Sequence, residues 1–239
     1  VPESDITWDI LWDSKYKDKI LMFDNARDSF AISLLRLGYS INSKDKDCWR
    51  KAADELIKQK PLVQAYVMDQ IFDKIGNEEA VLAPYYAGDA AIVLKNNSDI
   101  GFVIPQNGTN KFVDSMCIAK NSKHKAEAEK YINFMCSTPV ALANVKQTGY
   151  STPQREVYEL LSDDVKNNKI FYPDEETLKN AQIFVNLPEN INKFMDELWI
   201  EVKSGGKTGN SWLLVVILFV FVIMYLLVVL YKKKKMTEK

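Results

Sequence analysis

The sequence of 239 residues contains only one histidine, His124. A metal site built from several histidines is therefore excluded, and a Ser-His-Asp or Cys-His catalytic system would need this one residue. His124 lies within residues 120–130, a stretch of lysines and glutamates that is typical of a solvated helix start. We therefore expect no catalytic residue, no metal site and no bound cofactor.

Cysteine and arginine are also scarce. Cys48, Cys117 and Cys136 have none of the close spacing of zinc or redox motifs, and their odd number leaves at least one thiol unpaired if the chain is alone. We expect three buried, small side chains, with one disulfide left open as an alternative outside the cell. The few arginines and the net charge of −1 argue against nucleic-acid binding.

One long apolar run stands out from this polar background. Residues 212–231 contain no charge, proline or glycine, and a helix of that length spans about 30 Å, the thickness of a bilayer's hydrocarbon core. A buried helix of a soluble core is the alternative, but the lysines at 232–235 favour a single transmembrane helix. More basic residues follow the run than precede it, which predicts a cytoplasmic tail at 232–239. Residues 1–205 then lie outside the cell, joined by a linker at 206–211.

The chain begins at Val1 without an initiator methionine or a signal peptide, so we expect either a mature form or a fragment, and we favour a fragment. Short apolar runs then alternate with helix patterns. The strands that we predict are 19–23, 63–67, 100–105 and 111–119, and the helices are 25–38, 45–59, 69–75 and 87–95. Asp24 is the expected N-cap of the first helix and Gly38 its stop. Helices dominate from 124 to 203, and the alternation before them predicts an α/β fold with a mainly parallel sheet.

Several segments together resemble the spermidine/putrescine-binding proteins of ABC importers. In order, they are FDNARDSFAISLLRLGYSINS, APYYAGDAA, VIPQNGTNKFVDSMCIAKNSKHKAEAEKYINF and TGYSTPQREVYELLSDDVKNNKIFYPDEETLKNAQ. The resemblance implies a periplasmic-binding-protein-like fold of type II, whose two lobes close on a polyamine and deliver it to a membrane permease. It also implies that residues 1–113 and 159–203 form one nearly complete lobe. Residues 114–158 would belong to a second lobe that is mostly missing from this chain.

A polyamine site needs carboxylates for the ammonium groups and aromatic faces for the aliphatic stem. The resemblance places Asn25 and Asp28 there, on one face of a helix start, with Asn25 in place of the family's usual aspartate. For Asp28, an interaction with the positive end of the helix dipole is the alternative. Tyr86 stands where the family usually has tryptophan, at a strand end of the kind where open α/β sheets bind ligands. We expect Tyr85 in the core and Asp89 as a structural residue of a helix start.

Phe112 and Asp114 are two residues apart in a predicted strand, which would point both to one face. The family has tryptophan in place of Phe112 and keeps the aspartate. The resemblance thus implies that Asp114 pairs with an ammonium group while Phe112 covers the methylenes. Tyr150 matches a family tyrosine near the ligand, with packing at a helix end as the alternative. Phe184 occupies the place of a family glutamine, which leaves the specificity among polyamines open.

Three functions are compatible with these features. The first is capture of polyamines outside the cell by the substrate-binding component of an ABC importer, with the permease subunits as partners and the C-terminal helix as an anchor in the plasma membrane. The second is a membrane-anchored hydrolase that uses paired carboxylates, for which the sequence offers no supporting nucleophile or metal constellation. The third is a tethered polyamine sensor, which the short predicted tail disfavours. Capture makes and breaks no bond, so we expect no enzyme.

Overall fold

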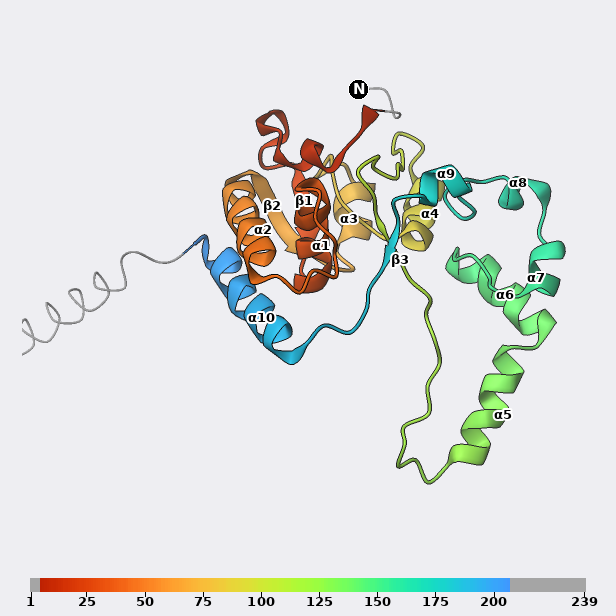
Figure 1. The fold of residues 1–239 in the computed structure, drawn as a ribbon. Helices are drawn as coiled ribbons and strands as arrows, with labels where there is room; N and C mark the ends of the chain where they lie inside the picture. Colours follow the sequence, from red (N-terminus) through yellow and green to blue (C-terminus); the bar gives the residue numbers. More distant parts are fainter. Residues whose placement is uncertain (1–4, 207–239) are drawn as a thin grey trace, which may run out of the picture.

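A computed structural model describes residues 5–206 of the chain (Figure 1). The predicted membrane helix at 212–231 and the predicted tail at 232–239 lie outside these residues, as does most of the predicted linker. Within residues 5–206, none of the helices combines the length and the apolar character that a membrane crossing requires.

Residues 5–96 and 189–204 together form the larger of the two parts seen in Figure 1, which we call the larger body. A small parallel sheet forms its centre. β1 (Ile20–Phe23) pairs with β2 (Val63–Val67), and Ile20 also forms a parallel bridge with Leu82, so β1 lies between the two segments. All four residues of β1 are buried, as expected of an inner strand. These elements confirm the predicted strands at 19–23 and 63–67 and their parallel order.

Helices α1 (Ala26–Arg36), α2 (Lys46–Gln59) and α10 (Glu189–Ser204) pack together beside this sheet (Figure 1). The apolar face predicted for α2 packs into the core. Trp49 on this face is fully buried, with its ring centroid 5.5 Å from that of Phe30. The end of α10 lies against the end of α2, where Lys60 Nζ donates a hydrogen bond to the carbonyl oxygen of Lys203. The last helix of the described chain therefore returns to the core that the first segments build.

Two buried serines connect α1 to its neighbours. Ser29 Oγ donates a hydrogen bond to the carbonyl oxygen of Phe23 at 2.8 Å, and Ser33 Oγ donates one to that of Ala52 at 2.9 Å. Because the hydroxyl groups are satisfied in this way, α1 is buried on more than one face without leaving polar atoms unpaired. The start of α1 is thereby held at the end of β1.

Residues 100–119 form less sheet than predicted. After α3 (Ile71–Gly76) and α4 (Ala87–Asn96), the chain has no strand at 100–105. The predicted strand at 111–119 is also wrong: β3 (Asn110–Lys111) is short and pairs in parallel with β4 (Gln182–Ile183). Residues 112–117 are exposed and no described strand lies beside them, so a backbone ladder cannot continue there.

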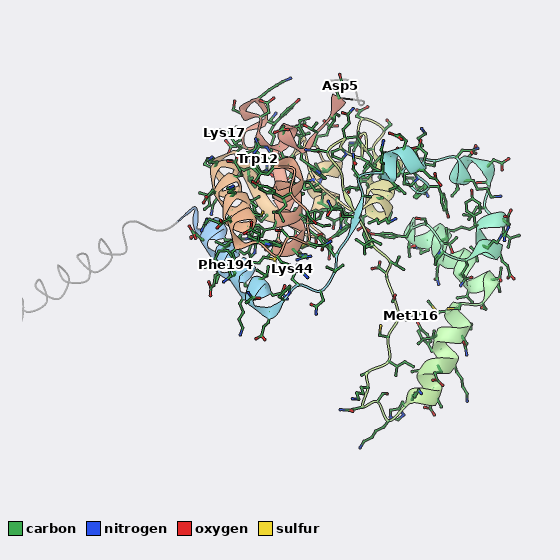
Figure 2. The ribbon with its side chains drawn as sticks, in the orientation of Figure 1. Asp5, Trp12, Lys17, Lys44, Met116 and Phe194 are labelled. Atoms are coloured by element: carbon green, nitrogen blue, oxygen red, sulfur yellow. The ribbon has the colours of Figure 1, made fainter. Side chains whose placement is uncertain are left out.

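A helical arm follows this extended segment. Its helices are α5 (Lys125–Met135), α6 (Thr138–Thr148), α7 (Arg155–Glu159), α8 (Asp163–Lys166) and α9 (Glu175–Leu178). Figures 1 and 2 show the segment around Met116 and α5 projecting away from the larger body. α5 has no buried residue, and Tyr131 and Phe134 on it are 58% and 59% exposed. The division of the chain into lobes at 113/114 and 158/159 stays a prediction.

The short 3-10 helices η2 (Trp8–Trp12), η3 (Ser14–Tyr16) and η4 (Lys60–Leu62) complete the described secondary structure. The three cysteines are free thiols. The prediction that they are buried is wrong for Cys117, in the exposed segment before the arm, and for Cys136, at the exposed end of α5, while Cys48 is half-buried. His124 is exposed at the N-cap position of α5, as its polar surroundings predicted.

Candidate functional site

Asp28 and Tyr86 meet at the carboxyl ends of the parallel segments. Asp28 lies in the first turn of α1, which follows β1, and Tyr86 directly precedes α4, after the bridge at Leu82. The Tyr86 hydroxyl donates a hydrogen bond to Asp28 Oδ2 at 2.9 Å. Asp28 is only 8% exposed, so this contact satisfies a buried carboxylate.

A row of aromatic rings continues from this pair; we call Phe23, Tyr86, Phe112 and Tyr150 the aromatic row. The ring centroid of Tyr86 lies 5.1 Å from that of Phe23 and 5.6 Å from that of Phe112. The rings of Phe112 and Tyr150 are 6.3 Å apart. Both ring contacts of Phe112 are edge-to-face, which is a favoured geometry, and Phe112 is 42% exposed. An aromatic surface is therefore open to a ligand.

A second tyrosine and carboxylate pair ends the aromatic row. The Tyr150 hydroxyl donates a hydrogen bond to Oδ2 of Asp89 at 3.0 Å. Asp89 lies in the first turn of α4, and Tyr150 directly follows Gly149, the C-cap of α6. Burial raises the pKa of Tyr150, and the charges of Asp89 and Asp114 raise it further. Three carboxylates thus surround the row.

Burial raises the pKa of both carboxyl groups that accept these hydrogen bonds. For Asp28, the hydrogen bond from Tyr86 and the charge of Arg27 act in the opposite direction. For Asp89, the hydrogen bond from its tyrosine acts in the opposite direction, while the charge of Asp69 adds to the rise. Carboxylates in such surroundings gain stability from a cation that enters the site.

Asn25 has a structural role at the same helix start. It is the N-cap of α1, and its side-chain oxygen accepts a hydrogen bond from the backbone nitrogen of Asp28 at 3.2 Å. The predicted N-cap at Asp24 is therefore wrong. Asp24 instead forms an ion pair with Lys203, with 2.6 Å between the charged atoms. A contact of Asn25 with a ligand stays a prediction.

Phe112 and Asp114 reach the site without a strand to carry them. β3 ends at Lys111, so the expectation that a strand points both residues to one face is wrong. Phe112 nevertheless contacts Tyr86 and Tyr150, and Asp114, although exposed, is close enough to act on the Tyr150 pKa. The predicted residues other than Asn25 are therefore gathered around the aromatic row, and their role toward a ligand stays a prediction.

The pairing of Asp89 with Tyr150 was missed at the level of sequence, where Asp89 was expected to be structural only. Gly88 was the available signal, because Tyr150 packs where a side chain at position 88 would lie. Arg27 was missed as well. Its guanidinium lies 4.7 Å from the ring centroid of Phe184, so the residue at the place of the family glutamine contacts an arginine. Tyr85, expected in the core, is half-buried and packs against the rings of Phe23 and Phe72 at the edge of the core.

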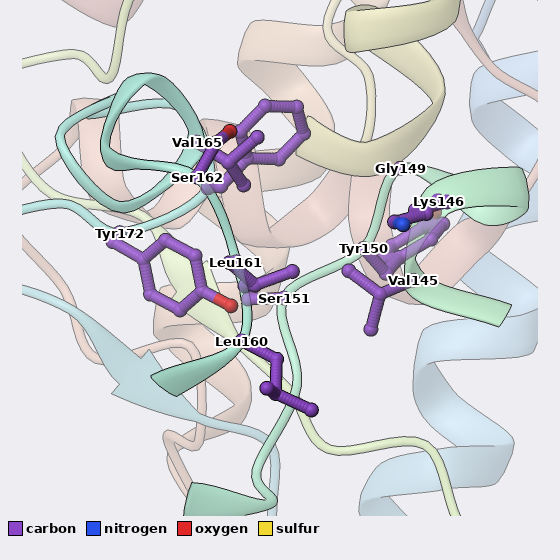
Figure 3. A pocket seen from close by; sticks show the side chains of 11 residues that line it. Val145, Lys146, Gly149, Tyr150, Ser151, Leu160, Leu161, Ser162, Val165 and Tyr172 are labelled. Carbon is purple, nitrogen blue, oxygen red and sulfur yellow. The ribbon is translucent and has the colours of Figure 1, made fainter. Parts of the chain in front are cut away.

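A separate cavity of about 550 Å³ lies beside α6 (Figure 3). Its lining is mainly apolar and consists of Val145, Lys146, Gly149, Tyr150, Ser151, Leu160, Leu161, Ser162, Val165, Phe171 and Tyr172. Tyr150 is the one member of the aromatic row among them, so the cavity adjoins the row without including Asp28 or Asp114. Within residues 5–206, no cluster of three or more His, Cys, Asp or Glu side chains has the arrangement of a metal site.

Known proteins are similar to this chain both in sequence and in fold. The spermidine/putrescine-binding periplasmic protein of Escherichia coli is 34% identical over 204 residues, which are 85% of this chain and 58% of that protein. A solved structure described as a putative spermidine/putrescine ABC transporter from Listeria monocytogenes has 36% identity and a TM-score of 0.78, covering 82% of this chain and 61% of that one.

The substrate-binding protein PotD of a spermidine/putrescine ABC transporter from Streptococcus pneumoniae has 32% identity and a TM-score of 0.72, covering 85% of this chain and 64% of that one. The chain thus spans less than two thirds of the length of these relatives. Residues 2–181 match the family model for bacterial extracellular solute-binding proteins. The predicted resemblance is confirmed at this level: the chain belongs to the bacterial extracellular solute-binding protein family.

Proposed function

We propose that this chain captures polyamines such as spermidine or putrescine outside the cell and delivers them to the permease of an ABC importer. The observation that carries the proposal is the aromatic row with carboxylates at both ends, at the carboxyl ends of the parallel segments. The names of the relatives support the same ligand class. The proposed process makes and breaks no bond, so the protein acts as a carrier rather than as an enzyme.

The proposed ligand contacts follow from the chemistry of a polyamine. Asp28 and Asp114 pair with ammonium groups, while Tyr86, Phe112 and Tyr150 cover the methylene stem and contribute cation–π attraction. Asn25 lies beside Asp28 and offers a further polar contact. The lobe formed by 1–113 and 159–203 would close on the lobe that contains 114–158, excluding water from the bound amine.

These contacts are strong enough for a useful affinity. One ammonium and carboxylate pair separated by about 4 Å gains about 4 kcal/mol at an effective dielectric constant of about 20, before desolvation. Two such pairs with aromatic contacts are compatible with micromolar binding, which corresponds to about 8 kcal/mol.

Calorimetric titration with spermidine and putrescine tests the proposal, on the longest natural chain that contains these 239 residues. We expect binding with an affinity near the micromolar range, and at least tenfold weaker binding for Asp114→Ala. Asp99→Ala, which removes an exposed carboxylate of another loop, is the matched control and should bind as the wild type does. Heat with amino acids or sugars but with no polyamine would exclude the proposed ligand class.

Anchoring is the second part of the proposal, and it rests on the sequence of residues 212–231. The helix would hold the binding domain at the outer surface of the plasma membrane, with residues 232–239 in the cytoplasm. In cell fractions washed with alkaline carbonate, the full chain should stay with the membranes, and a chain that stops at residue 206 should not. Release of the full chain by carbonate would contradict the anchor.

A further inference from the structure

Tyr150 is seated on the first turn of α4. A Cβ atom added at Gly88 would lie 2.4 Å from Cδ2 of the Tyr150 ring and 2.5 Å from Cε2, distances that real contacts do not reach. The ring therefore lies directly on the glycine backbone. Replacing Gly88 by any other residue would force the ring to move.

The residue before Tyr150 brings the backbone into the same position. Gly149 has a φ of 72°, which favours glycine, and ends α6. A Cβ atom on Gly149 would lie 3.0 Å from the carbonyl oxygen of Gly88. The two glycines thus allow the end of α6 and the start of α4 to approach closely.

Asp89 then determines how the Tyr150 hydroxyl is turned. Because this hydroxyl donates its hydrogen to Asp89, its oxygen lone pairs are directed elsewhere and remain available as acceptors. A phenol that donates to a carboxylate is also a better acceptor, since hydrogen bonds in a chain polarise one another. An ammonium group has donors and no acceptor, so it requires an oxygen in this state.

We infer that Gly88 and Asp89 are positioning residues of the polyamine site, which place the Tyr150 ring in the aromatic row and turn its hydroxyl into an acceptor for an ammonium group. The inference rests on the proposed function and deepens it. Neither residue needs to touch the ligand, because both act through Tyr150. The contact of Tyr150 with Gly88 and Asp89 also joins two parts of the chain, since α4 lies in the larger body and α6 lies in the arm.

A double-mutant cycle on polyamine affinity tests the role of Asp89. Asp89→Ala should lower the affinity about tenfold, the scale of one hydrogen bond to a charged group. Tyr150→Phe should have a similar effect, and Asp89→Ala should add nothing in the Tyr150→Phe background. Asp89→Asn should stay within about threefold of the wild type, because its amide oxygen still accepts the hydroxyl hydrogen. Asp73→Ala, which removes an exposed carboxylate in the first turn of α3, is the control without effect.

A matched pair of glycine variants tests Gly88. Gly88→Ala should lower the affinity at least tenfold, whereas Gly76→Ala, where a Cβ meets nothing within 4 Å, should not change it. In a Tyr150→Ala background the effect of Gly88→Ala should disappear, because the ring that it displaces is absent. Melting temperatures of all variants identify any that fail to fold. If Gly88→Ala is among them, the double-mutant cycle of Asp89 and Tyr150 still tests the inference.

Two results would overturn the inference while leaving the proposed function intact. One is that the losses of polyamine affinity caused by Asp89→Ala and by Tyr150→Phe multiply in the double variant, as they would for residues that act independently. The other is a loss for Asp89→Asn as large as that for Asp89→Ala, which would mean that the carboxylate charge acts on the ligand directly. If the wild type binds no polyamine, the proposed function fails. The same double-mutant cycle, measured on the free energy of unfolding, then tests the contact of Tyr150 with Asp89. Strictly additive changes in that free energy would overturn the inference.

Discussion

Replacing Asp28 by asparagine should make the ligand-free protein more stable and its polyamine binding much weaker. Asp28 is 8% exposed, and burial holds the pKa of its carboxyl above the ordinary value of 3.8. The ionised group therefore costs folding free energy at neutral pH. Asparagine keeps the shape and an oxygen that accepts the Tyr86 hydroxyl hydrogen, and it removes the charge.

The sign of the pH dependence follows from the direction of this pKa shift. Since the folded pKa lies above the unfolded one, the folded protein binds more protons between the two values, and stability falls as pH rises through that window. The cost is fully present above the folded pKa and disappears below the unfolded value of 3.8. We expect Asp28→Asn to be about 1–2 kcal/mol more stable at pH 7, the scale of relieving a buried charge. The difference should shrink as pH falls to about 3.5.

The same change removes one ammonium contact from the proposed site. An ion pair of about 4 kcal/mol, reduced by desolvation, leads us to expect about a hundredfold loss of affinity, or about 2.7 kcal/mol. Urea unfolding at several pH values and calorimetric titration with spermidine measure the two effects. Asp73→Asn, an exposed carboxylate in the first turn of α3, is the control. A less stable Asp28→Asn at pH 7, or a difference that does not change with pH, would refute the argument.

Two further changes separate the core from the site. Trp49→Ala removes a fully buried indole packed against Phe30, and urea unfolding should show a loss of about 3–5 kcal/mol; a loss below about 1 kcal/mol would show that the site collapses or was loosely packed. Phe112→Ala removes a ring that is 42% exposed, so polyamine affinity should fall about tenfold while stability changes by less than about 1 kcal/mol. A variant that loses stability and keeps its affinity would contradict the assignment of Phe112 to the site.

The elements of the larger body could be predicted from sequence because their signals are local. The apolar residues of α2 recur with the helical period, and the short apolar run of β1 is bounded by polar residues. The extended segment after Lys111 could not be predicted in this way. Its alternation of apolar and polar residues is typical of a strand, but a strand also needs a neighbouring backbone, and no described segment provides one.

The site shows the same division between local and distant signals. Asp28, Tyr86 and Phe112 could be predicted because each lies in a segment that resembles a known family. The pairing of Asp89 with Tyr150 could not, since the two residues are 61 positions apart and only the fold brings them together. Gly88 carries a trace of this contact, but a glycine in a helix start has several possible causes.

The alignment of α10 with α2 has a mechanical consequence. Phe194 near the start of α10 contacts Lys46 at the start of α2, Glu201 pairs with Arg50, and Gly206 lies beside Ile57, so the two helices run side by side in the same direction. A force that pulls on residue 206 along the axis of α10 would load this whole interface in shear, and its contacts would resist together rather than peel apart one by one.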